Sequence, residues 1–136
     1  MSALSASQLA VFHDARRLLA GQIELAREAP STGPIAPVAA TPFGAGYLMG
    51  VVDALCQIHE VPFDAVALGI FGAILDETCE RDATSERDAA IESLTAGDDE
   101  RYGFADGYRY GGNEALGWSR GACMPSTLVL LARQKK

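Results

Sequence analysis

Two acidic residues occupy the same place in a segment that occurs twice in this chain. Asp53 follows Gly50 by three residues, as Glu114 follows Gly111. If the two copies lie side by side, the carboxylates approach each other, and the pKa of one of them rises. Such a pair is suited to acid/base catalysis or to half of a metal site, and His59 and Glu60 follow closely enough to add ligands. The sequence therefore allows a metal-binding or catalytic site made of Asp53, His59, Glu60 and Glu114.

A structural role for the two acids is the simpler interpretation. Each would then cap a neighbouring helix or pair with Arg109 or Arg120, because buried acids normally have such partners. No His-x-x-His or Glu-x-x-His spacing supports a metal, and no phosphate-binding loop or Gly-x-Ser-x-Gly motif is present. We expect no catalytic residue and no cofactor, and keep the metal-binding protein or enzyme as the alternative.

The repeated segment has a definite pattern. Phe43-Gly-Ala-Gly-Tyr-Leu-Met-Gly-Val-Val-Asp-Ala-Leu55 returns as Phe104-Ala-Asp-Gly-Tyr-Arg-Tyr-Gly-Gly-Asn-Glu-Ala-Leu116. Both copies fit Phe-x-x-Gly-Tyr-x-x-Gly-x-x-acid-Ala-Leu without a gap, which predicts an internal duplication. The spacing resembles the Gly-x-x-x repeats of some helical adaptor and secretion-apparatus proteins, and we take no function or residue role from that resemblance.

Small residues recur every fourth position in both copies. They are Gly46, Gly50 and Ala54 in the first copy and Gly103, Gly107, Gly111 and Ala115 in the second. Each glycine inside a helix costs about 0.5–1 kcal/mol relative to alanine, so close backbone contact must compensate. We expect this stripe to pack one helix against another, with a bound peptide or ligand as the alternative. Charged residues around the second copy exclude a membrane dimer stripe.

Apolar periodicity, prolines and capping residues predict the helices. They are expected at about 6–28, 42–58, 62–80, 85–96, 98–118 and 127–136. Ser5 and Gln8 have the spacing of a capping box, Thr41 precedes Pro42, and Thr84 or Ser85 would cap the fourth helix. The composition of the intervening segment, 30–41, predicts an apolar, proline-rich linker that lies along the surface. The last segment has some strand propensity, but its basic end and the repeat favour a helix.

These elements predict an all-α fold. We expect one domain over 1–136, a helical bundle of about six helices. The duplication divides it into two three-helix units related by a pseudo-two-fold axis. The first covers about 6–80 and includes the Pro-rich linker 29–42; the second covers about 84–136.

Charge and cysteine content limit the class of function. The formal net charge is -7, which argues against binding nucleic acid or anionic membrane, and no apolar run is long enough to span a bilayer. Three widely spaced cysteines, Cys56, Cys79 and Cys123, suggest buried, reduced thiols and a cytoplasmic protein. The N-terminus has no signal-peptide pattern.

A protein partner is the remaining expectation. The stretch from Asp76 to Glu100 contains ten of the eighteen acidic residues, so it could attract a basic partner. Aromatic residues and arginine, which are enriched at interfaces, follow it. The interface candidates are Glu86, Asp88, Glu92, Tyr102, Tyr108, Arg109, Tyr110 and Trp118. We therefore expect a small acidic, non-enzymatic interaction or assembly module that binds a basic protein or forms a homodimer.

Overall fold

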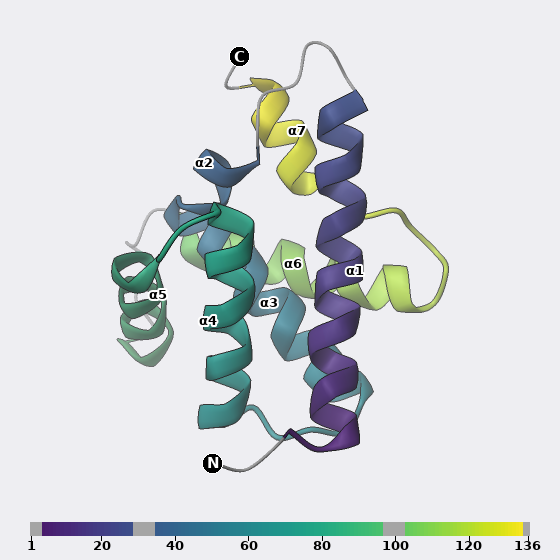
Figure 1. The fold of residues 1–136 in the computed structure, drawn as a ribbon, viewed down its shortest axis with the longest axis vertical. Coiled ribbons are helices and arrows are strands. Elements are labelled where there is room, and N and C mark those ends of the chain that lie inside the picture. Colours follow the sequence, from purple (N-terminus) through teal and green to yellow (C-terminus); the bar gives the residue numbers. More distant parts are fainter. Residues whose placement is uncertain (1–3, 29–34, 97–102, 135–136) are drawn as a thin grey trace.

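The chain folds into helices throughout the part that the structure describes. The computed structural model describes residues 4–28, 35–96 and 103–134, except the side chains of 95, 96, 133 and 134, and these residues contain seven helices and no strand (Figure 1). The helices are α1 (Ala6–Glu28), α2 (Ala36–Ala39), α3 (Pro42–Ile58), α4 (Ala65–Cys79), α5 (Thr84–Ala96), α6 (Phe104–Ser119) and α7 (Thr127–Gln134). The predicted all-α class is confirmed. None of these helices combines the length and apolar character needed to cross a membrane.

Helix α3 lies at the centre of the structure. Figure 1 shows it behind α1 and α4, and it also packs against α2, α5 and α6. Nearly every side chain from Gly44 to Cys56 is buried, with Asp53 the exception. A helix that is apolar on all sides is stable only when other helices surround it, so this position follows from its sequence.

Two helix starts agree with the predicted capping residues. The Ser5 amide donates to Oε1 of Gln8 at 2.8 Å, and the Gln8 amide donates to Oγ of Ser5 at 3.1 Å. At the start of α3, Oγ1 of Thr41 accepts from the Gly44 amide at 3.0 Å, with Pro42 in the first turn. These bonds satisfy amides that have no partner within the helix.

Helix α2 was not predicted. The segment 30–41 was expected to be a linker on the surface, yet Ile35, Val38 and Ala39 are buried. Pro37 is compatible with so short a helix because it lies in the first turn, where its missing N–H costs no hydrogen bond. The apolar side chains of the segment enter the core, and the prediction of a surface linker is wrong for 35–41.

Three further helix starts differ from the prediction. Helix α4 begins at Ala65 rather than Pro62, because Oδ1 of Asp64 accepts from the amides of Val66 and Ala67, at 3.0 and 3.2 Å. Helix α5 begins at Thr84, whose own amide and hydroxyl donate to Asp82. The side chain that caps α5 is therefore Asp82, two residues before Thr84, whose own hydroxyl was one of the two predicted caps.

Helix α6 begins later than predicted. Its first residue is Phe104, and Gly103 precedes it with a φ of 84°, a left-handed value that glycine adopts at little cost. The expected helix start at Asp98 and Asp99, and the expected end of the previous helix at Gly97, lie outside the described residues. At the C-terminal end, 127–134 is helical, so the predicted helix is correct and the strand alternative is wrong.

Candidate functional site

Helices α3 and α6 are in backbone contact through the glycines of α6. A Cβ atom added at Gly107 would lie 2.0 Å from the carbonyl oxygen of Phe43, and one at Gly111 would lie 2.0 Å from that of Tyr47. Real Cβ atoms essentially never come so close to another atom. Both positions therefore require glycine, as the four-residue spacing predicts.

The glycines of α3 make the reciprocal contact. A Cβ at Gly46 would lie 2.3 Å from the carbonyl oxygen of Phe104, and one at Gly50 would lie 2.0 Å from that of Tyr108. Residue numbers rise together along the two helices, so α3 and α6 run parallel. The expected helix–helix packing by the glycine stripe is confirmed. Gly103, the N-cap of α6, also lies against α3, since a Cβ added there would lie 3.3 Å from Cβ of Phe43.

Two other glycines, Gly69 and Gly72, lie within α4. A Cβ added at Gly72 would lie 2.8 Å from Cδ of Arg87, so that helix does approach the side chain of a neighbour. No atom lies within 4 Å of a Cβ added at Gly69, so this glycine marks no close contact.

Each motif acid binds the tyrosine of the other helix. The hydroxyl of Tyr47 donates to Oε1 of Glu114, and the hydroxyl of Tyr108 donates to Oδ2 of Asp53. Asp53 also accepts from Nε2 of Gln57 at 3.3 Å. Both carboxylates are thus engaged by phenols, and among the described residues neither acid bonds to the other or to an arginine.

Glu114 also holds the start of α7. Its Oε1 accepts from the amides of Ser126 and Thr127, both at 3.3 Å. Helix N-termini carry a partial positive charge and unpaired N–H groups, so a carboxylate stabilises them. The role of this acid as a cap for a neighbouring helix is confirmed.

A buried glutamine completes this network. Nε2 of Gln22 donates to the Tyr47 oxygen at 2.9 Å, and its Oε1 accepts from the Leu128 amide at 3.0 Å. Gln22 and Tyr47 are 1% and 0% exposed. Sequence reasoning missed Gln22, although it is the polar member of the buried stripe of α1 that includes Leu18 and Ala26. The network joins α1, α3, α6 and α7.

The two phenols stay protonated at neutral pH. Burial raises the pKa of Tyr47, and the hydrogen bond to Glu114 and the charge of that acid raise it further. Burial and then Asp53 raise the pKa of Tyr108 in the same way. A neutral phenol is a hydrogen-bond donor, so both tyrosines serve to hold carboxylates rather than to exchange protons.

The four residues of the alternative metal site do not converge. Nε2 of His59 lies 2.8 Å from Oδ2 of Asp14, and Glu60 lies in the turn that follows α3 with a φ of 58°. Across the described ranges, no group of three or more His, Cys, Asp or Glu side chains could hold a metal ion. The structure does not bring Asp53, His59, Glu60 and Glu114 together.

The aromatic interface candidates divide into two groups. Tyr108 is half-buried against Asp53, and Trp118 is half-buried with the Arg17 guanidinium 5.5 Å from its ring centre. Tyr110 is 49% exposed, and Arg109 lies beside its ring. Tyr102 lies outside the described residues.

The acidic candidates do not form one outer face. Glu86 is turned inward and bound by Arg81, whose hydrogen bond lowers the pKa of the carboxyl. Asp88 and Glu92 are exposed. Nearby, Asp82 caps α5, and Asp76 accepts from the Ala83 amide at 2.9 Å. Part of the acidic stretch therefore stabilises helix ends.

The three thiols are free but not equally buried. Cys56 and Cys79 are buried as expected, whereas Cys123 is exposed in the turn between α6 and α7. Burial, followed by the charges of Asp53 and Asp64, raises the pKa of Cys56 to about 11. The expectation of buried thiols is wrong for Cys123, because glycine-rich turns lie at the surface.

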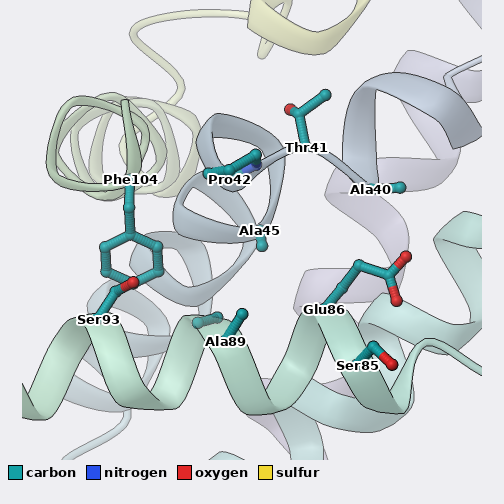
Figure 2. Close-up of a pocket in the computed structure, with 10 residues that line it drawn as sticks. Ala40, Thr41, Pro42, Ala45, Ser85, Glu86, Ala89, Ser93 and Phe104 are labelled. Atoms are coloured by element: carbon teal, nitrogen blue, oxygen red, sulfur yellow. The ribbon is translucent and has the colours of Figure 1, made fainter. Parts of the chain in front are cut away.

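A small cavity lies between α5 and the start of α3. Its volume is about 200 Å³, and small side chains form most of its wall (Figure 2). Phe104 reaches across from α6 at one end.

Comparisons of this chain with protein-family models, curated proteins and solved structures found no match. Its function must therefore be inferred from its own residues.

Proposed function

We propose that this chain is a protein-binding module and that the outer side of α6 is its docking surface. We define the α6 docking surface as Phe43, Asp106, Arg109 and Tyr110. The observation that carries the proposal is the exposure of Tyr110, with the Phe43 ring 5.9 Å away and Arg109 over its face. Tyrosine and arginine are enriched among the residues that contribute most to binding at protein interfaces.

The corresponding side of α3 supports this assignment. The motif aligns Arg109 with Leu48 and Tyr110 with Met49, and both α3 residues are fully buried. Among the helices that the structure describes, five pack against α3, whereas α6 packs chiefly against α3 alone. The side of α6 that matches a covered side of α3 is therefore open, and a partner protein would cover it.

A basic partner fits better than a second copy. The chain has a formal net charge of -7, so its overall charge favours a basic partner. Within the docking surface, Asp106 is 61% exposed and pairs with Arg109 at 2.9 Å. Two acidic copies repel each other, while a basic protein is attracted over several ångströms. We therefore commit to a basic partner protein. Self-association is then an outcome that the experiment distinguishes.

Affinity capture followed by reconstitution with the purified partner tests this function. We expect a basic partner whose affinity falls as salt rises, and at least a tenfold loss with Tyr110→Ala. Leu9→Ala is the control, because Leu9 is a similarly exposed apolar residue (41%) on α1. Equal loss with both variants would contradict the proposal. If light scattering shows a homodimer, and Tyr110→Ala dissociates it, the partner at this surface is a second copy of the chain rather than a basic protein.

We also propose that the chain arose by duplication and forms one domain of two three-helix units. Reciprocal contacts support this: Gly46 faces Phe104 as Gly107 faces Phe43. The motif helices thus pair like a parallel helix dimer within one chain. The unequal packing around α3 and α6 indicates that the second unit diverged, which left the docking surface open. With three free thiols, the proposed location is the cytoplasm, where thiols stay reduced.

A further inference from the structure

The cavity beside α5 is distinct from the α6 docking surface. Ala45 of α3 and Ala89 and Ala90 of α5 form much of its wall, and Phe104 lies at one end (Figure 2). The wall is predominantly apolar. An apolar cavity of about 150 Å³ in another protein is large enough to bind benzene, so the roughly 200 Å³ here can accept a single ring.

One polar group in this cavity lacks a partner. Ser93 is 5% exposed, and among the described residues its hydroxyl has no hydrogen bond to another group. Figure 2 shows this hydroxyl rising from α5 toward the Phe104 ring, at one end of the cavity. A buried hydroxyl without a hydrogen bond is unfavourable. A ligand with a hydroxyl or carbonyl group would supply the missing partner.

The remaining polar groups of the wall are either engaged or, as with Ser85, exposed to solvent. The Glu86 carboxylate is bound by Arg81, and the Thr41 hydroxyl donates to the Val38 carbonyl at 2.6 Å. The wall therefore has no unbalanced charge and needs no charged ligand. An uncharged molecule loses little solvation on entry.

We infer that this cavity binds a small uncharged ring compound with one hydroxyl or carbonyl group. The ring occupies the space between Ala45 and Ala90, and the polar group pairs with the Ser93 hydroxyl. This ligand site is independent of the proposed docking function, and either can fail without the other.

Titration of the isotope-labelled protein with phenol and with toluene, followed by NMR, tests the inference. Both probes should cause saturable shifts at Ala45, Ala90 and Phe104. Ser93→Ala should weaken phenol binding by roughly three- to tenfold, the effect of one hydrogen bond, and leave toluene binding unchanged. Absence of saturable shifts at these residues up to about 10 mM phenol would overturn the inference. An equal effect of Ser93→Ala on both probes would overturn the role of the hydroxyl.

Blocking the cavity gives a second test. Ala89→Leu places a larger side chain at its wall and should abolish binding of both probes. Ala105→Leu, at an exposed position of α6 outside the cavity, should leave binding unchanged. If circular dichroism shows that Ala89→Leu does not fold, Ser85→Leu at the same cavity serves instead. Binding that survives a folded blocking variant would show that the probes bind elsewhere.

Discussion

Replacing Gly111 by alanine tests the packing of α3 against α6. The new Cβ would lie 2.0 Å from the Tyr47 carbonyl oxygen, and ordinary contact begins at 3.4 Å. The helices would have to separate by about 1.4 Å at this point, since the atoms that the Cβ meets are backbone rather than the end of a flexible side chain.

The expected loss of stability follows from two opposing effects. Overpacking a close contact costs about 1–3 kcal/mol, and a rigid backbone on both sides places this case at the upper end. Alanine recovers about 1 kcal/mol because it favours the helix more than glycine does. The net fall in the free energy of unfolding is about 2 kcal/mol, which lowers the urea midpoint by about 1 M.

Urea unfolding followed by circular dichroism at 222 nm measures this change. Gly69→Ala is the matched control, because Gly69 is also inside a helix and no atom lies within 4 Å of its added Cβ. The control should be stabilised by about 0.5–1 kcal/mol, since only the helix preference changes. If Gly111→Ala were as stable as the natural chain or more stable, the close contact between α3 and α6 would be refuted.

Three further predictions concern the buried polar groups. Tyr47→Phe removes the hydroxyl that donates to Glu114 and should lower the free energy of unfolding, measured by urea denaturation, by about 2 kcal/mol. An unchanged free energy of unfolding would show that this hydrogen bond contributes nothing. Because the pKa values of Tyr47 and Tyr108 are raised above the ordinary 10.0 in the folded state, the unfolded state loses these two protons first. The two phenols should therefore add no pH dependence below about pH 9, and the free energy of unfolding should fall as the pH rises above 10. Thermal unfolding across that range measures this, and rising stability would contradict it. With a thiol reagent, the exposed Cys123 should react at once. Cys56 should react only when the protein unfolds, because it is buried and its pKa is raised to about 11. Rapid reaction of two thiols would contradict this burial.

Much of the central pairing could be predicted from the sequence. The four-residue spacing of small residues indicates a face that only a second backbone can approach closely, and the repeat supplied that partner. The apolar character of 43–56 likewise required a central position. Both inferences depend only on the order of residues within one short segment, which can be read directly from the sequence.

The partners of polar groups could not be predicted in the same way. Asp53 and Glu114 were candidates for each other, yet each binds a tyrosine of the opposite helix. Which group a carboxylate meets depends on the register of two helices distant in the sequence, and both arrangements agree with the motif. The same holds for Gln22, whose partners Tyr47 and Leu128 are far away in the chain.

The prediction of a surface linker at α2 was wrong for a different reason. Three prolines in 30–41 indicate a linker, but burial of Val38 and Ala39 favours a compact turn of helix over an extended chain. Tertiary contact outweighed local preference there.

The most direct test of the central claim is the set of NMR contacts between α3 and α6. Parallel packing predicts nuclear Overhauser effects from Gly107 to Phe43 and from Gly111 to Tyr47. It also places Tyr110 on the open side, where it corresponds to a buried residue of α3. Contacts in the opposite order, with Gly111 near Phe43 and Phe104 near Gly50, would contradict the parallel arrangement and the docking surface inferred from it.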